Sequence, residues 1–111
     1  MERYKSIEFP DFTPLTLTEF YFLLVLNRED TNSWAVRKRV MEITDNQVSI
    51  VIPTLYYTAN QLKAKKLIKR SERREHGRGN IYAITPAGKN NLGLEIKRLS
   101  QAVTFYLQKP Q

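Results

Sequence analysis

The chain is poor in the residues that most enzymes and metal sites use: among its 111 residues it has one histidine and no cysteine. Without cysteine it forms neither disulfides nor thiolate metal sites, and one histidine is too few for a structural zinc site. No catalytic triad or phosphate-cradling glycine loop is visible either. We therefore expect a protein that is not an enzyme and has no cofactor, suited to the reducing cytoplasm.

Long apolar runs are also missing. The longest run spans residues 20–26, far short of the roughly 20 residues that a membrane helix needs. We expect no membrane span and, at this length, a single domain with one hydrophobic core.

Positive charge, by contrast, is abundant and concentrated. Residues 63–78 contain eight Lys or Arg and two Glu, a net charge of +6, whereas the whole chain carries +7. A surface charged in this way favours a polyanionic partner such as a nucleic acid.

Local signals predict four helices. Thr16 and Glu19 fit a capping box at the start of an apolar helix. Residues 31–33 offer N-caps for a second helix. Pro53 suits the first turn of a third helix, and the Thr-Pro pair at 85–86 begins a fourth.

Short β-branched segments predict a hairpin between the third and fourth helices. They cover residues 68–73 and 81–84 and flank a turn at 77–80 that contains two glycines. Residues 48–52 are predicted as a brief strand or an extended linker.

The order of these elements is that of a winged helix-turn-helix. The fold class is α+β, mostly α, with three helices, a β-hairpin wing and a long C-terminal dimerisation helix. We divide the chain into an N-terminal arm (1–15), a winged-helix DNA-binding domain (16–85) and the C-terminal dimerisation helix (86–111).

Five short segments carry a family resemblance. They are Leu17-Thr18-Glu19-Phe20-Tyr21-Phe22-Leu23-Leu24, Ala35-Val36-Arg37-Lys38-Arg39-Val40, Pro53-Thr54-Leu55-Tyr56, Leu67-Ile68 and Tyr82-Ala83-Ile84-Thr85-Pro86-Ala87-Gly88. In this order they resemble the PadR family of bacterial transcriptional regulators. The resemblance implies a short-type member that dimerises through one C-terminal helix and represses transcription. Some such proteins respond to small planar ligands bound near the dimer interface.

The chain departs from the family pattern at three places. Asn32-Ser33-Trp34 stands where members commonly have a His-Gly-Tyr-like start to the second helix, and Pro53 stands where glycine is usual. Lys66 also replaces a glycine, at a helix C-terminal turn that often requires a positive φ.

The third helix is predicted to read DNA. Thr54, Tyr57, Thr58, Gln61 and Lys65 share one face at helical spacing. Their hydroxyl and amide groups can hydrogen-bond to base edges in the major groove, and Lys65 suits a phosphate. Leu55, Ala59 and Leu62 are expected to form the buried stripe of this helix. Tyr56 is expected nearer that stripe, in the core.

The hairpin is predicted to contact the DNA backbone or minor groove. Its candidate residues are Arg73, Arg74, His76 and Arg78, because the adjacent glycines let the backbone approach closely. Lys38 in the second helix is expected to add a backbone contact. The alternative for these residues is a solvated charged surface.

The fourth helix carries an apolar seam. Leu92, Ile96, Leu99, Val103 and Tyr106 recur at spacings of four and three residues, the pattern of a coiled-coil contact. We expect a homodimer through this seam; packing on the helix's own domain is the alternative. Trp34 is expected either in the core or lining a ligand cavity at the dimer centre.

These features predict a homodimeric, sequence-specific transcriptional regulator, acting as a repressor on a pseudo-palindromic operator in double-stranded DNA. The alternative is a non-specific DNA- or RNA-binding winged-helix module. Few aromatic residues interrupt the basic segment, which disfavours stacking on single strands.

Overall fold

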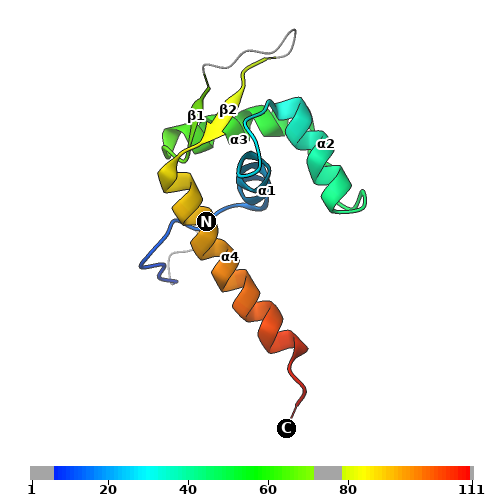
Figure 1. Ribbon diagram of the computed structural model, residues 1–111, viewed down its shortest axis with the longest axis vertical. Helices are drawn as coiled ribbons and strands as arrows, with labels where there is room; N and C mark the ends of the chain where they lie inside the picture. The colour runs from blue at the N-terminus through cyan, green and yellow to red at the C-terminus, as the bar shows by residue number, and fades with distance from the viewer. Residues whose placement is uncertain (1–6, 72–78, 111) are drawn as a thin grey trace.

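The computed structural model describes residues 7–71 and 79–110, and Figure 1 shows how its elements are arranged. They are α1 (Leu17–Leu26), α2 (Ser33–Ile43), α3 (Ile52–Ala64), β1 (Ile68–Arg70), β2 (Tyr82–Ile84) and α4 (Pro86–Leu107). Three helices, a hairpin and a long helix in this order confirm the predicted winged-helix architecture.

The core forms around α1, which packs against α2, α3 and α4. Phe22 and Leu23 of α1 are fully buried with Val36 of α2 and with Leu55 and Leu62 of α3. Burial of each such side chain contributes about 1.5–3 kcal/mol. This cluster fixes the three helices relative to one another and leaves the outer face of α3 free.

The predicted helix starts are confirmed by their hydrogen bonds. The Thr16 hydroxyl accepts from the Glu19 amide at 3.1 Å, and the Glu19 carboxylate accepts from the Thr16 amide at 2.9 Å. The Asn32 side chain accepts from the Ala35 amide at 2.8 Å and caps α2. Pro53 lies in the first turn of α3. Each cap pairs an amide that the helix itself cannot pair, and Pro53 has no amide hydrogen that would need a partner there.

The turn from α3 into β1 is a left-handed cap without glycine. Lys66 has φ +62°, as its position in the sequence predicted. The Leu67 amide donates to the Leu62 carbonyl at 3.0 Å, and the Lys66 amide donates to the Lys63 carbonyl at 2.9 Å. This bonding pattern is the Schellman motif. It directs the chain sharply from the end of α3 into the wing.

The wing is a short antiparallel hairpin with one added partner. Ile68 lies opposite Ile84, and Arg70 lies opposite Tyr82. Thr31, just before α2, exchanges two backbone hydrogen bonds with Tyr82, at 3.1 and 2.9 Å. This bridge connects the start of α2 to the wing and was not predicted. Residues 48–51 form an extended linker and not a strand.

The base of α4 is pressed against the α3–β1 turn. The Thr85 hydroxyl accepts from the Gly88 amide at 3.0 Å and donates to the Lys66 carbonyl at 2.8 Å. A Cβ atom at Gly88 would lie 2.1 Å from the Leu67 carbonyl oxygen, so only glycine permits this approach. The Thr-Pro-Ala-Gly sequence therefore fixes where α4 begins relative to the wing.

The arm before α1 lies along the first half of α4. The Thr13 amide donates to Asn91 Oδ1 at 2.8 Å, and the Asn91 side-chain amide donates back to the Thr13 carbonyl at 2.9 Å. Leu15 is buried in the core. Phe9 and Phe12 contact each other edge to face. The described part of the arm, from residue 7 onward, is thereby attached to α4.

Beyond this attachment, α4 leaves the body and ends far from the wing (Figure 1). The molecule measures 57 × 31 × 28 Å with a radius of gyration of 15.3 Å, larger than the roughly 13 Å of a compact chain this long. Residues 100–110 are all exposed. Within residues 7–71 and 79–110, no helix is both long and apolar enough to cross a bilayer.

Candidate nucleic-acid interface

The outer face of α3 is open to solvent. Its exposed residues are Pro53, Thr54, Tyr56, Tyr57, Asn60, Lys63 and Ala64. Tyr57 is 65% exposed and Tyr56 48% exposed. The face carries hydroxyl, phenol and amide groups together with one lysine. A helix with such a face fits the major groove of B-DNA, where those groups can hydrogen-bond to base edges.

The five residues predicted to read DNA do lie together, but only some of them belong to this outer face. Thr54 and Tyr57 are exposed, and Gln61 is half-buried at the edge. Thr58 is only 2% exposed, so its predicted place on the open face is wrong. Its hydroxyl donates to the Thr54 carbonyl at 2.8 Å, within α3 itself.

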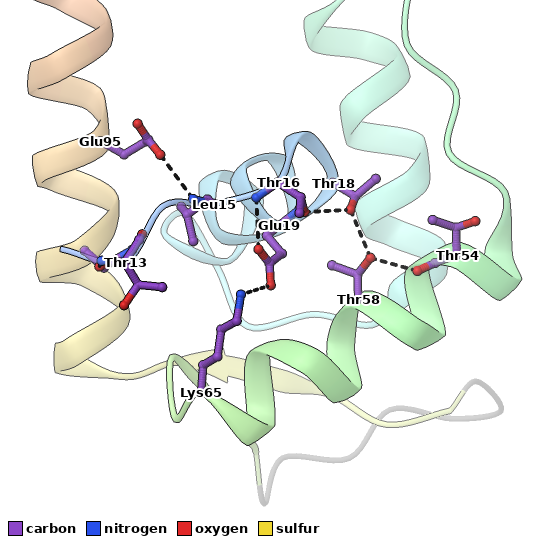
Figure 2. A network of polar contacts seen from close by, with 10 residues as sticks. Thr13, Leu15, Thr16, Thr18, Glu19, Thr54, Thr58, Lys65 and Glu95 are labelled. Atoms are coloured by element: carbon purple, nitrogen blue, oxygen red, sulfur yellow. Dashed lines mark hydrogen bonds and ion pairs between the residues drawn. The ribbon is translucent and has the colours of Figure 1, made fainter. Parts of the chain in front are cut away.

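Lys65 is also occupied within the protein. Its ammonium lies 2.7 Å from the Glu19 carboxylate, and the Glu19 side chain is 4% exposed. Figure 2 shows this pair beside a second contact between the same helices, in which the Thr18 and Thr58 hydroxyls lie 3.1 Å apart. The predicted phosphate contact of Lys65 therefore competes with an ion pair that already exists.

The N-terminus of α1 explains this arrangement. The five predicted residues line a shallow depression whose other wall is formed by α1. Its lining residues are Thr16, Thr18, Glu19, Thr54, Tyr57, Thr58, Gln61 and Lys65. Helical spacing correctly placed the α3 residues on one side of the helix. It could not show that another helix packs against half of that side.

Two residues of the outer face, Tyr56 and Asn60, were missed. The expectation that Tyr56 belongs to the core is wrong, since it is 48% exposed. Neighbouring residues of a helix point about 100° apart, so Tyr56 need not follow buried Leu55 into the core. Asn60 follows Tyr56 and Tyr57 by four and three positions, the spacing that could have identified it.

The wing supplies positive charge at the same end of the molecule. Lys69 and Arg70 on β1 are exposed, as are Gly79 and Asn80 before β2. Gly79 has φ +57°, a backbone conformation that glycine adopts without strain. Arg73, Arg74, His76 and Arg78 lie outside the described residues. Figure 1 places the hairpin and α3 at the end opposite to the free half of α4.

The start of α2 borders both α3 and the wing. A depression of about 290 Å³ is lined by Asn32, Ser33, Trp34, Tyr56, Asn60, Gly79, Asn80 and Tyr82. Trp34 is 46% exposed, so the core placement is wrong. The indole lies beside the outer face of α3 and not beside the seam of α4. Lys38 is exposed one turn further along α2.

The predicted seam on α4 divides into an inner and an outer part. Leu92 is 4% exposed and belongs to the protein's own core, which corrects its assignment to the dimer contact. Leu99 is half-buried. Ile96, Val103 and Tyr106 are 40%, 55% and 83% exposed, and off-seam Phe105 and Leu107 are 79% and 70% exposed. Most of the apolar outer half of α4 therefore faces solvent.

Two further ion pairs lie away from the outer face of α3. Arg39 pairs with Glu42 at 3.2 Å on the surface of α2, and Arg98 pairs with buried Glu95 on α4. No three acidic or histidine side chains in residues 7–71 and 79–110 are grouped so that they could hold a metal ion.

Comparison with known proteins agrees with this geometry. No curated protein sequence matches the chain, but solved structures do. A transcriptional regulator from Clostridium thermocellum is 24% identical, with a TM-score of 0.68 over 83% of this chain and 90% of that one. A PadR family transcription regulator from hypervirulent Clostridium difficile R20291 is 19% identical, with a TM-score of 0.67 over 84% and 100%.

A PadR-like transcription factor from Bacteroides fragilis is 22% identical, with a TM-score of 0.61 over 79% of this chain and 87% of that one. These likenesses support the fold. The sequence pattern of the transcriptional regulator PadR-like family matches residues 22–94, from α1 into α4. The protein therefore belongs to the PadR-like family of transcriptional regulators.

Proposed function

We propose that this PadR-like protein is a homodimeric repressor that binds a pseudo-palindromic DNA operator. Family membership makes it a DNA-binding transcriptional regulator and not an enzyme. The dimer, the operator and the direction of regulation go beyond that membership. They rest on the position of the outer face of α3 and on the apolar outer half of α4.

The single observation that carries the proposal is the outer face of α3 next to the wing. Tyr57, Asn60 and Tyr56 project from a helix whose opposite side is fully buried. In our proposal Thr54, Tyr56, Tyr57, Asn60 and Gln61 meet base edges, because phenol, hydroxyl and amide groups match donors and acceptors in the major groove. Base contacts of this kind give sequence preference.

Backbone contacts in the proposal come from basic side chains on α2, on β1 and in the segment between β1 and β2. They are Lys38 on α2, Lys69 and Arg70 on β1, and Arg73, Arg74, His76 and Arg78 of the wing. Such contacts position the protein without reading sequence. Each phosphate neutralised releases counterions, so binding should weaken steeply as salt rises.

The dimer in our proposal forms through the outer half of α4. Ile96, Leu99, Val103 and Tyr106 continue the helical seam past the body, and a second copy would cover them. A two-fold axis through this contact presents two copies of α3 in the same way. Half-sites are then expected one helical turn of DNA apart, about 34–36 Å.

The proposal places a small planar ligand against Trp34. Its half-exposed indole lines the depression that Tyr56 and Asn60 also line. A ring stacked there would occupy space next to the outer face of α3 and compete with DNA. Trp34 is the only tryptophan, so quenching of its fluorescence by planar aromatic compounds tests this directly.

The test of the main proposal begins with selection of bound duplexes from a random-sequence library. We expect an enriched motif with two-fold symmetry, gel-shift stoichiometry of one dimer per duplex, and reduced expression of a reporter placed behind the motif. Equal affinity for selected and scrambled duplexes across a salt series would replace this proposal with the non-specific binding alternative.

A further inference from the structure

Two buried carboxylates bind neighbouring amides in the segment that leads into α1. The Leu15 amide donates to Glu95 of α4 at 3.4 Å, and the Thr16 amide donates to Glu19 of α1 at 2.9 Å. Glu95 and Glu19 are only 4% and 3% exposed. Figure 2 shows both contacts on the same short piece of backbone, between α4 on one side and α1 on the other.

Each carboxylate uses its second oxygen for a cation. Glu95 Oε1 accepts from Arg98 one turn further along α4. Glu19 Oε2 accepts from Lys65 at 2.7 Å, and Lys65 is the C-terminal cap of α3. A continuous polar path therefore runs from α4 through the segment before α1 to the end of the helix that faces DNA.

We infer that Glu19 is a positioning residue for sequence recognition: it holds α3 at a fixed angle by binding Lys65, and it keeps the Lys65 ammonium away from DNA phosphates. The inference rests on the proposed function, in which the outer face of α3 reads bases. Glu19 itself does not touch DNA in this account.

The energetic reason lies in the burial of Glu19. A carboxylate removed from water is stable only when its oxygens are paired. One oxygen of Glu19 accepts from the Thr16 amide and the other from Lys65. Movement of the end of α3 would leave this charge without its cation, so the pair strongly favours one position of α3.

Hydroxyl groups also hold the middle of α3 against α1. The Thr58 hydroxyl, itself bound to the Thr54 carbonyl, lies 3.1 Å from the Thr18 hydroxyl. Two contacts about two turns apart on α3 thus fix its rotation relative to α1. The angle at which Tyr57 and Asn60 enter a groove follows from this rotation, and base contacts require close positioning.

The test compares Glu19→Gln with Glu42→Gln in the full-length protein. Both substitutions remove one negative charge that pairs with a cation, but Glu42 lies in an exposed pair within α2. The probes are the duplex selected by the wild-type protein and a scrambled duplex of equal length. Measured quantities are the ratio of the two affinities and the slope of log affinity against log salt concentration.

We expect Glu19→Gln to lower the affinity ratio about fivefold or more, the lower end of what one good base contact supplies. Its salt slope should steepen by about one unit, because the released Lys65 can reach a phosphate. Glu42→Gln should change neither quantity. A role in folding alone would lower both affinities together and leave the salt slope unchanged.

Lys65→Gln provides a second variant at a partly exposed position, since the Lys65 side chain is 34% exposed. Its affinity ratio should fall as in Glu19→Gln, while its salt slope stays at the wild-type value. Lys97→Gln, at an exposed position of α4, is the control for loss of one positive charge. A slope reduced by about one unit with an unchanged affinity ratio would identify Lys65 as a phosphate ligand and overturn the inference.

Failure of this inference differs from failure of the proposed function. If the wild-type protein prefers its selected duplex and Glu19→Gln and Lys65→Gln keep that preference, only the positioning role is wrong. If the wild-type protein shows no preference, the proposed function fails and takes the inference with it.

Discussion

Two residues at the junction of α3, β1 and α4 have an unusual backbone conformation or an unusually close backbone contact. Lys66 occupies a left-handed conformation with φ +62°, which costs a residue with a Cβ atom about 1–2 kcal/mol. Gly88 faces the Leu67 carbonyl at a distance that leaves no room for a Cβ atom. Both residues act on the same turn, so the direction in which the wing leaves α3 depends on them.

Lys66→Gly should stabilise the protein by about 0.5–1 kcal/mol. Glycine adopts a positive φ without strain, and the strain relieved exceeds the additional conformational entropy that glycine loses on folding. Chemical denaturation at one fixed protein concentration measures the change. Lys63→Gly, three residues earlier and inside α3, is the matched control and should destabilise by about 1 kcal/mol. Equal effects of the two substitutions would contradict the assigned left-handed cap.

Gly88→Ala should destabilise the protein by about 2–3 kcal/mol, because the methyl group forces α4 away from the Leu67 carbonyl. Gly93→Ala is the control in the same helix. Among the described residues, nothing apart from the adjacent residues and the helix's own backbone lies within 4 Å of a Cβ built at Gly93, so that substitution should stabilise α4 by about 0.5–1 kcal/mol. Thermal unfolding of both variants gives the comparison; a stabilised Gly88→Ala protein would exclude the close contact.

Residues that act locally were the ones the sequence could predict. The cap side chains of Thr16, Asn32 and Thr85 each accept from an amide three residues further along the chain. Such caps depend only on the neighbouring sequence. Thr58 was misplaced because its partner, Thr18, lies 40 positions away. The ion pair of Lys65 was not foreseen because Glu19 lies 46 positions away. Nothing in a local pattern distinguishes a hydroxyl that faces DNA from one that faces another helix.

At the scale of elements, α3 is the part whose outer face reads DNA in the proposed function. Its buried stripe was correctly predicted from Leu55, Ala59 and Leu62, all fully buried. Its exposed face is rotated relative to the predicted one, towards Tyr56 and Asn60 and away from Thr58. The rotation follows from packing of the α1 N-terminus against one side of α3.

Asn60→Ala should change which bases are preferred, because a side-chain amide in the major groove pairs specifically with one base edge, most often adenine. The expected loss is about 1–3 kcal/mol at one base pair of each half-site. Selection repeated with the variant reveals the altered position. Asn90→Ala on the exposed surface of α4 is the control, and an unchanged motif with both variants would remove Asn60 from the reading face.

The hairpin is a second element that the sequence predicted only in part. Its two strands were predicted, and the structure has them over residues 68–70 and 82–84, but the bridge between Thr31 and Tyr82 was not predicted. One residue pair, 51 positions apart, leaves no periodic signal. Through this bridge the start of α2, with Trp34, is fixed next to the wing. A change in DNA contact at the wing should therefore affect the surroundings of the indole.

Binding of the selected duplex should alter the emission of Trp34, because the indole is half-exposed beside Tyr56 and Asn60 and DNA would change its solvation. Titration of the protein with duplex, followed at the tryptophan emission maximum, measures the effect. A scrambled duplex at the same salt concentration is the control. Emission unaffected by saturating selected duplex would move the DNA contact away from the start of α2.

At the scale of the whole molecule, the body and the outer half of α4 are separate surfaces at opposite ends (Figure 1). The extended shape, 57 Å along its longest axis, results from a helix that continues well past the domain on which it packs. The sequence predicted an apolar seam but not its division. Leu92 joins the core because α1 and the described part of the arm pack against α4, the arm at Asn91 and Glu95.

In the proposed dimer, Val103→Asp should yield a monomer, because a carboxylate in an apolar helix contact must lose its water without gaining a partner. Val103 is 55% exposed beyond the body, so the fold of each monomer should survive. Sedimentation equilibrium measures the mass and circular dichroism checks the fold. Gln101→Asp, on an exposed position of the same helix, should remain dimeric; dimeric Val103→Asp would place the contact elsewhere.

The contact of Gly88 with the Leu67 carbonyl fixes the base of α4 next to the wing, so the angle of α4 and the position of the wing are coupled. A helix of 22 residues is about 33 Å long. A tilt of about 5° at its base therefore moves its far end by about 3 Å, as simple geometry on that length requires. The reverse also holds: small displacements at the free end become fine angular adjustments beside the hairpin. The tight packing that forbids a side chain at position 88 would thus keep the angle between α4 and the wing constant.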